Sequence, residues 1–187
     1  MKNKIVVITG GNSGIGRITA TEIAKLGAQV ILVCRNEQKA KAVQEDINAL
    51  TGLNNCDLFF CDFSSHASIK KFAKEFRMKY NQIDVLINNA GAILGERETN
   101  DEGLEMMFAT NHLGYFLTTH YLLPSLQKAE NARIVNVASV GHWMAKLDFD
   151  NLQSEKKFNS FSQYCTTKLC NILFTRKLAK ELAHTNI

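Results

Sequence analysis

The chain has 187 residues, of which 45% are hydrophobic and 21% charged, enough for one domain with a sizeable core. Its net charge of +4 arises from interleaved acidic and basic residues, so the charge pattern indicates neither a nucleic-acid nor a membrane partner. No apolar run approaches the roughly 18 residues that span a bilayer, and we expect no signal peptide, because a strand pattern begins at once.

The first apolar segment runs directly into a glycine-rich turn. Ile5 to Ile8 favour a strand, Gly10, Gly14 and Gly16 follow, and helical periodicity then covers 14–27. This order aims the free N–H groups of a helix N-terminus at a phosphate, and glycine lets the backbone approach a pyrophosphate closely. The spacing differs from the common G-x-G-x-x-G fingerprint, and a purely structural turn is the alternative interpretation.

Strand and helix patterns alternate through most of the chain. Apolar runs predict five strands, at 4–9, 29–34, 56–61, 83–87 and 133–138. Helical periodicity predicts helices at 14–27, 37–50, 65–80, 104–126 and about 160–184. Continuous apolar strands joined by helices predict an α/β fold with a doubly wound parallel sheet of the Rossmann type, helices on both faces, in one domain over 1–187.

Polar residues follow the predicted strands at the sheet edge where ligands bind in such folds. They are Thr9, Arg35, Asp62, Asn88 and Ser139. Arg35 stands where NAD-binding folds commonly place an acid for the ribose 2′-hydroxyl, and a guanidinium suits a 2′-phosphate instead. The sequence therefore favours NADP over NAD, although Arg35 could be an ordinary exposed arginine and Glu37 is a rival ribose ligand.

Two further motifs at this edge have two interpretations each. Asp62 could accept a hydrogen bond from an adenine amino group or cap the helix that begins near Ser65. Asn88-Asn89-Ala90-Gly91 permits close approach of the backbone to a cofactor, and it is equally a set of good turn residues.

Tyr164 and Lys168 lie four residues apart on the last predicted helix, hence on one face. An ammonium near a phenol favours the phenolate and lowers the phenol pKa from about 10, which suits proton exchange with an oxygen during hydride transfer. Such a pair alone is usually a solvated helix face. Ser139, at the end of the fifth strand, strengthens the catalytic interpretation because its hydroxyl could orient a carbonyl oxygen.

Together these motifs resemble the short-chain dehydrogenase/reductase family. The family's cofactor motif is matched by Thr9-Gly10-x-x-x-Gly14-Ile15-Gly16, and its fourth-strand motif is matched by Asn88 to Gly91. Its catalytic tetrad is matched by Asn111, Ser139, Tyr164 and Lys168. Asn111-His112-Leu113-Gly114 and Tyr164-Cys-Thr-Thr-Lys168 are similar to the retinol dehydrogenase branch. The resemblance covers the chain from residue 4 to its end.

The resemblance implies a role for each matched residue. Tyr164 would be the general acid/base, Lys168 would bind the nicotinamide ribose, Ser139 would position the carbonyl oxygen, and Asn111 would support a proton-relay water. Asp62 would contact adenine. Cofactor contacts are implied for Gly10, Asn12, Ser13, Gly14, Ile15, Gly16, Arg35, Asp62, Asn88, Ala90, Gly91, Tyr164 and Lys168.

The implied activity is NADP(H)-dependent interconversion of a retinal-like or other lipophilic aldehyde or ketone with its alcohol. We expect a cytoplasmic protein or one peripheral to an intracellular membrane, without an N-terminal anchor, and a homo-oligomer formed through the helices that carry Asn111 and Tyr164. A non-catalytic nucleotide-binding or partner-binding isoform is the alternative. No basic stripe with interleaved aromatic residues indicates nucleic-acid binding.

The family pattern predicts more chain than is present after Ile187: a further strand, a loop against the nicotinamide, a substrate-covering helix and a last strand. We therefore expect a C-terminally incomplete domain in which Ile134, Val135 and Val137 form an exposed apolar edge. In the loop after the fifth strand, Trp143 is expected either to wall a substrate pocket or to cover the core.

The remaining candidate ligands have structural interpretations. Five cysteines without C-x-x-C spacing predict reduced thiols, with neither a metal site nor a disulfide framework. His112, beside Asn111, is expected to pack and form hydrogen bonds rather than to catalyse.

Overall fold

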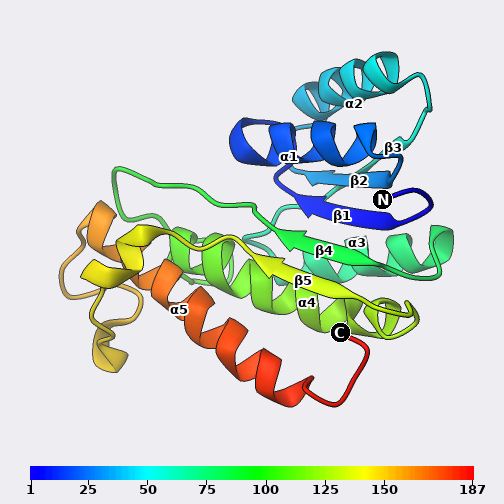
Figure 1. Cartoon of the computed structure of the whole chain (residues 1–187). Helices are drawn as coiled ribbons and strands as arrows, with labels where there is room; N and C mark the ends of the chain where they lie inside the picture. Colours follow the sequence, from blue (N-terminus) through cyan, green and yellow to red (C-terminus); the bar gives the residue numbers. More distant parts are fainter.

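The computed structural model describes residues 1–187 and contains one parallel five-stranded sheet (Figure 1). The strands are β1 (Ile5–Thr9), β2 (Gln29–Cys34), β3 (Cys56–Phe60), β4 (Val85–Asn88) and β5 (Arg133–Asn136). Their order is β3-β2-β1-β4-β5, so the chain winds outward from β1 in both directions. Ligands bind at the point where the strand order reverses, here between β1 and β4. The predicted doubly wound parallel sheet is confirmed.

Helices cover both faces of the sheet. Figure 1 shows α1 (Gly14–Lys25) and α2 (Glu37–Thr51) on one face and α3 (His66–Lys79), α4 (Gly114–Leu126) and α5 (Ser160–Glu181) on the other. Three short helices lie in the connections: η1 (Phe108–Leu113), η2 (Val140–Met144) and η3 (Phe149–Asn151). No helix is both long enough and apolar enough to cross a bilayer.

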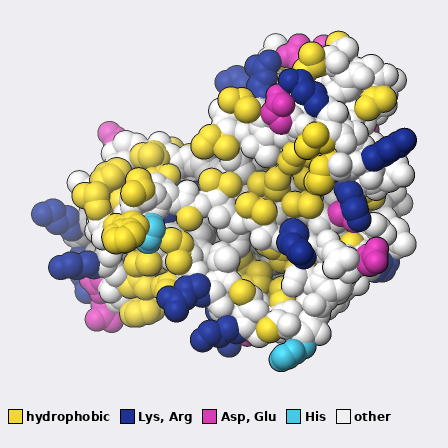
Figure 2. All heavy atoms as spheres, viewed as in Figure 1, with side chains coloured by type: hydrophobic (Ala, Val, Ile, Leu, Met, Phe, Trp, Pro, Cys, Tyr) yellow, Lys and Arg dark blue, Asp and Glu magenta, His cyan; other side chains and the backbone are white.

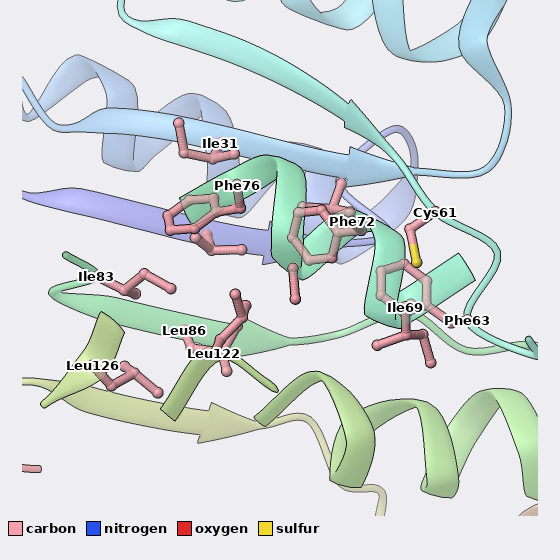
Figure 3. Close-up of a cluster of buried hydrophobic side chains, with 14 of the residues drawn as sticks. Ile31, Cys61, Phe63, Ile69, Phe72, Phe76, Ile83, Leu86, Leu122 and Leu126 are labelled. Atoms are coloured by element: carbon pink, nitrogen blue, oxygen red, sulfur yellow. The ribbon is translucent and has the colours of Figure 1, made fainter. Parts of the chain in front are cut away.

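The core has two layers, one on each side of the sheet, because successive strand residues point to opposite faces. Val7 belongs to the cluster under α3 and α4, whereas Val6 and Ile8 belong to the cluster under α1 and α2. Figure 3 shows Phe72 and Phe76 of α3 lying against the first of these faces. The five cysteines are free thiols, and four of them are buried.

Several boundaries differ from the sequence prediction. The helix predicted over 104–126 is two helices: η1 is a π-helical segment, and α4 starts only at Gly114. The predicted end at residue 126 is correct, and Pro124 lies inside α4. The fourth strand begins at Val85 rather than at residue 83, because the Ile83 amide donates to the Ser125 carbonyl of α4.

β5 is one edge of the sheet, and its outer face is only partly apolar. Val135 is 46% exposed, whereas Ile134 packs against the first core cluster and Val137 against the second. The expectation of three exposed apolar residues is therefore correct only for Val135.

Asp84 ties the start of β1 to β4 and makes folding stability depend on pH. Its side chain is 2% exposed, and its carboxylate accepts hydrogen bonds from the Ile5 amide and the Lys4 ammonium, both at 2.9 Å. Burial acts to raise the pKa of the Asp84 carboxyl, but these hydrogen bonds outweigh burial and hold the pKa below its ordinary value. The carboxylate therefore stabilises the fold above about pH 4, and this stabilisation is lost as the pH falls through the folded-state pKa.

We expect Asp84→Asn to lower the free energy of unfolding at pH 7 by about 2 kcal/mol and to weaken its decline below about pH 4. Urea unfolding at pH 7 and at acidic pH measures both effects. Asp46→Asn is the matched control, because Asp46 forms an exposed pair with Arg17 and should contribute about 0.5 kcal/mol or less. An Asp84→Asn protein that loses stability with acid as steeply as the native chain would contradict this account.

Candidate active site

One cavity of about 860 Å³ lies at the C-terminal ends of the strands. This volume is within the usual range for cofactor and ligand sites, about 300 to 1,000 Å³. Most of the predicted site residues line it: Gly10, Asn12, Ser13, Gly14, Ile15, Gly16, Arg35, Asp62, Ala90, Gly91, Ser139, Tyr164 and Lys168. Segments that are far apart in the sequence therefore converge at one edge of the sheet. Asn88 and Asn111 do not line the cavity.

The N-terminus of α1 opens into this cavity without a side-chain cap. Asn36, Ser65 and Asn159 each accept a hydrogen bond from the first turn of α2, α3 and α5. Ser13, at the same position of α1, accepts none, and the first turn of α1 has no acidic residue. The uncapped amides and the positive end of the helix dipole form a site that suits an anion such as a phosphate.

The glycine turn is tied to the segment after β4 by hydrogen bonds. The Asn89 side-chain amide donates to the carbonyl oxygens of Thr9 and Gly10, at 2.9 and 3.2 Å. A Cβ at Gly16 would lie 2.5 Å from both the Gly10 oxygen and the Asn89 Nδ2 atom. Gly10 has φ of +68°, and a Cβ there would lie 2.8 Å from Ala90 Cα. Only glycine fits these two positions without displacing the turn.

Two unpaired cations lie at the end of β2. Arg35 and Lys39, one turn apart at the start of α2, both line the cavity and form no ion pair with an acid. Glu37 points elsewhere, since it does not line the cavity and pairs with Lys41 at 2.7 Å. Glu37 is therefore not placed to compete for a ribose, whereas the two cations are placed to attract an anionic group.

Asp62 lines the cavity and does not cap α3. The cap of α3 is Ser65, whose side chain accepts from the Ser68 amide. The Asp62 Oδ1 atom accepts from the amide and the hydroxyl of Ser64, at 2.9 and 2.7 Å. The helix-capping interpretation of Asp62 is therefore wrong, and its second carboxylate oxygen has no partner within the protein.

Ser139 and Tyr164 meet beside Gly141. The Ser139 hydroxyl oxygen accepts a hydrogen bond from the Gly141 amide at 3.2 Å. A Cβ on Gly141 would lie 3.5 Å from Ser139 Oγ and 3.9 Å from Tyr164 Cε1, so both side chains border one small space. Both also line the cavity. Both hydroxyl-bearing side chains are therefore available to a carbonyl compound bound in the cavity.

Lys168 lies below Tyr164 with its ammonium buried. Its Nζ is 5.6 Å from the centre of the Tyr164 ring and donates to the Val137 carbonyl at 2.9 Å. The residue is 4% exposed, and burial lowers the pKa of the Lys168 ammonium to about 8. Tyr164 and Lys168 thus lie on one face of α5, as their four-residue spacing predicts.

Asn111 and Asn88 lie behind the cavity wall. Asn111 is fully buried in the π-helical segment, where its side chain pairs with the amide and carbonyl of Ala92 at 2.8 and 2.9 Å. The Asn88 side chain donates to Thr119 and Asn136 in the interior. Asn111 thus fixes the segment after β4 from within, and Asn88 ties the end of β4 to α4 and β5.

His112 packs next to Asn111, as predicted. Its ring forms a 3.0 Å hydrogen bond with Asn171. Burial lowers the pKa of His112, and the hydrogen bond with Asn171 only partly offsets this effect.

The sequence prediction missed a buried network that links η1 to α5. The Glu105 carboxylate is fully buried and accepts from the amides of Met107 and Phe108 and from the Gln163 side chain, at 2.7 to 2.9 Å. Gln163 immediately precedes Tyr164, so this network holds the start of the tyrosine-bearing helix against the segment that carries Asn111. Glu105 falls inside the helix predicted over 104–126, so no local signal in the sequence indicates this network.

Hydrophobic side chains also line the cavity. Ile93 and Leu94 come from the segment after β4, and Met106 and Met107 from the start of η1. Figure 2 shows further hydrophobic side chains gathered over η2, η3 and the start of α5. Trp143 belongs to this surface: it is 81% exposed and does not line the cavity, so neither predicted role for it is correct.

The residues that line the cavity suit the phosphates, the adenine and the nicotinamide end of a dinucleotide. An uncapped helix N-terminus suits the pyrophosphate, and two free cations suit a further phosphate. Asp62 offers an acceptor, and the Tyr164–Lys168 pair and Ser139 line the same cavity. The arrangement is equipped to hold a nucleotide cofactor and to exchange a proton with a bound oxygen.

Comparisons with known proteins agree with this geometry. The sequence model described as short chain dehydrogenase matches residues 4–187. The chain is 42% identical over 187 residues to retinol dehydrogenase 11 of Homo sapiens and 43% identical over 184 residues to retinol dehydrogenase 12 of Bos taurus. These alignments include 100% and 98% of this chain but only 59% and 58% of the two relatives.

Solved structures share the fold. A protein of Mycobacterium paratuberculosis superimposes with a TM-score of 0.86 at 34% identity, over 97% of this chain and 63% of that one. A short chain dehydrogenase of Shigella flexneri 2a, complexed with NADP, superimposes with a TM-score of 0.81 at 25% identity, over 99% of this chain and 74% of that one.

Proposed function

The chain belongs to the short-chain dehydrogenase family, and we propose that it is an NADP(H)-dependent oxidoreductase that interconverts a lipophilic aldehyde or ketone, retinal-like in character, with its alcohol. The observation that carries this proposal is one cavity that holds the uncapped start of α1, the free Arg35 and the Tyr164–Lys168 pair. The NADP complex of the Shigella flexneri relative supports the choice of cofactor.

When bound, the nicotinamide would supply or accept the hydride. The first turn of α1 would hold the pyrophosphate, Arg35 and Lys39 the 2′-phosphate, and Asp62 the adenine. Tyr164 would donate a proton to the carbonyl oxygen during reduction, while Ser139 orients that oxygen by a second hydrogen bond. The ammonium of Lys168 would favour the phenolate that Tyr164 leaves behind.

The proposed substrate class rests on the hydrophobic lining and on the relatives. Ile93, Leu94, Met106 and Met107 give part of the cavity an apolar lining that favours a lipophilic substrate. The similar proteins are named retinol dehydrogenases, at 42% and 43% identity. A turnover assay that follows NADPH absorbance with retinal, medium-chain aldehydes and a polar aldehyde of similar size tests the proposal. We expect oxidation of NADPH with the lipophilic compounds only. NADPH binding without turnover of any carbonyl would favour the non-catalytic alternative.

Arg35→Ala should weaken NADPH binding by about 10- to 100-fold and leave NADH binding nearly unchanged, because a charge-assisted contact to the 2′-phosphate is lost. Lys39→Ala should act in the same direction with a smaller effect. Fluorescence titration with each cofactor measures the two dissociation constants, and their ratio gives the preference for NADPH over NADH. Lys41→Ala is the matched control on the same helix, since Lys41 pairs with Glu37 outside the cavity. Equal losses for NADPH and NADH in Arg35→Ala would overturn the assignment.

A further inference from the structure

We propose that Tyr115 is a positioning residue that holds the Lys168 ammonium beneath Tyr164 through the face of its aromatic ring. Tyr115 lies on α4, one turn after Asn111, and its side chain is 1% exposed. The Lys168 Nζ atom lies 5.3 Å from the centre of the Tyr115 ring. This separation is within the roughly 6 Å over which an aromatic face attracts a cation.

The hydroxyl group of Tyr115 does not account for its burial. It is one of three buried side-chain polar atoms in the molecule that have no hydrogen-bond partner. A buried hydroxyl without a partner is destabilising, so the useful part of this side chain is its ring. Burial and the neighbouring Tyr164 raise the pKa of Tyr115 far above its ordinary value, so Tyr115 stays neutral and exchanges no proton.

Apart from the aromatic rings, few contacts within the protein stabilise the positive charge of Lys168. It makes one hydrogen bond, to the Val137 carbonyl, and burial lowers the pKa of its ammonium. No carboxylate faces it: the titratable groups packed around it are Tyr164 on its own helix and Tyr115 on α4. The two rings, 5.3 and 5.6 Å from Nζ, therefore form an aromatic clamp around the ammonium.

The aromatic clamp has a consequence for the reaction. A ring face favours the charged form of lysine, so weakening it lowers the pH at which Lys168 loses its proton. Any activity that needs the charged ammonium should then be lost at a correspondingly lower pH. The inference rests on the proposed function only where it assigns Lys168 a role in catalysis. The aromatic clamp itself is present in the cofactor-free protein.

The test is an NMR titration of the cofactor-free 187-residue protein with ¹³C-labelled lysine, in which the Lys168 signal is assigned by its loss in Lys168→Met. Position 115 carries in turn tyrosine, phenylalanine, 4-fluorophenylalanine and 3,4,5-trifluorophenylalanine. These side chains keep the shape of the ring while fluorine progressively weakens the negative charge of its face. We expect Tyr115→Phe to leave the Lys168 midpoint unchanged and the trifluoro ring to lower it by about 0.5 to 1 pH unit.

Two results would overturn the proposal: a midpoint that does not vary along the fluorinated series, or a shift in Tyr115→Phe as large as that of the trifluoro ring. The first excludes the ring face, and the second assigns the effect to the hydroxyl. Trifluorophenylalanine at position 121 is the control, because Tyr121 on the same helix stacks on His66 rather than on a lysine. Failure of NADPH binding would refute the proposed cofactor while leaving this titration interpretable.

Discussion

Gly16→Ala is expected to weaken NADPH binding at least about 100-fold, equivalent to about 2.7 kcal/mol. The new Cβ would lie 2.5 Å from the Gly10 carbonyl oxygen and from the Asn89 side-chain amide. Backbone cannot yield as a flexible side chain does, so either the glycine turn or the Asn89 hydrogen bonds must move. In both cases the amides at the start of α1 lose the direction that suits a pyrophosphate. We also expect a loss of about 1 to 3 kcal/mol in the free energy of unfolding.

Fluorescence titration with NADPH and urea unfolding measure the two effects separately. Gly52→Ala is the control: Gly52, unlike Gly16, has a positive φ, of +66°, and it lies at the end of α2 with no atom within 4 Å of the new Cβ. It should cost backbone strain of about 1 kcal/mol and leave NADPH binding unchanged. A Gly16→Ala protein that binds NADPH as tightly as the native chain would show that the cofactor does not use this turn.

Tyr164→Phe is expected to lower kcat for carbonyl reduction by about 10²- to 10⁴-fold, with NADPH binding nearly unchanged. The substitution removes one hydroxyl from the space that Tyr164 shares with Ser139 and leaves the ring over Lys168 in place. Because the lost hydrogen bond is needed in the transition state, the effect should appear in kcat and not only in KM.

Steady-state kinetics with the best lipophilic aldehyde, beside an NADPH titration, separates chemistry from binding. Tyr121→Phe provides the control, because the Tyr121 hydroxyl contacts His66 outside the cavity. Native-like turnover in Tyr164→Phe would remove Tyr164 from the proposed chemistry.

The fold could be predicted because its signals are local and repeated. Each strand contains an apolar run, and the five runs alternate with helical periodicity, which is the pattern of a parallel sheet covered on both faces. The same pattern predicts that Arg35, Asp62 and Ser139 lie at one edge of the sheet, and all three line the cavity there. The family resemblance is confirmed by the match over residues 4–187.

Other features depend on contacts between distant segments. Lys39 and Lys41 are both lysines on the first turns of α2, and only the folded structure shows that one lines the cavity while the other pairs with Glu37. Asp62 was a candidate cap for a helix predicted to begin near Ser65, and only the folded structure shows that Ser65 itself is the cap of α3. The π-helical segment around Asn111 keeps the apolar pattern of an ordinary helix, so periodicity extends the prediction across it.

Titration of the 187-residue protein with NADPH and, separately, with NADH tests whether the edge cavity binds NADP(H). Nicotinamide fluorescence should rise and saturate with NADPH at a concentration at least about 10-fold lower than with NADH, because only NADPH carries the 2′-phosphate that Arg35 and Lys39 can reach. Binding of neither cofactor, in protein whose circular dichroism and cooperative unfolding show that it is folded, would contradict the account.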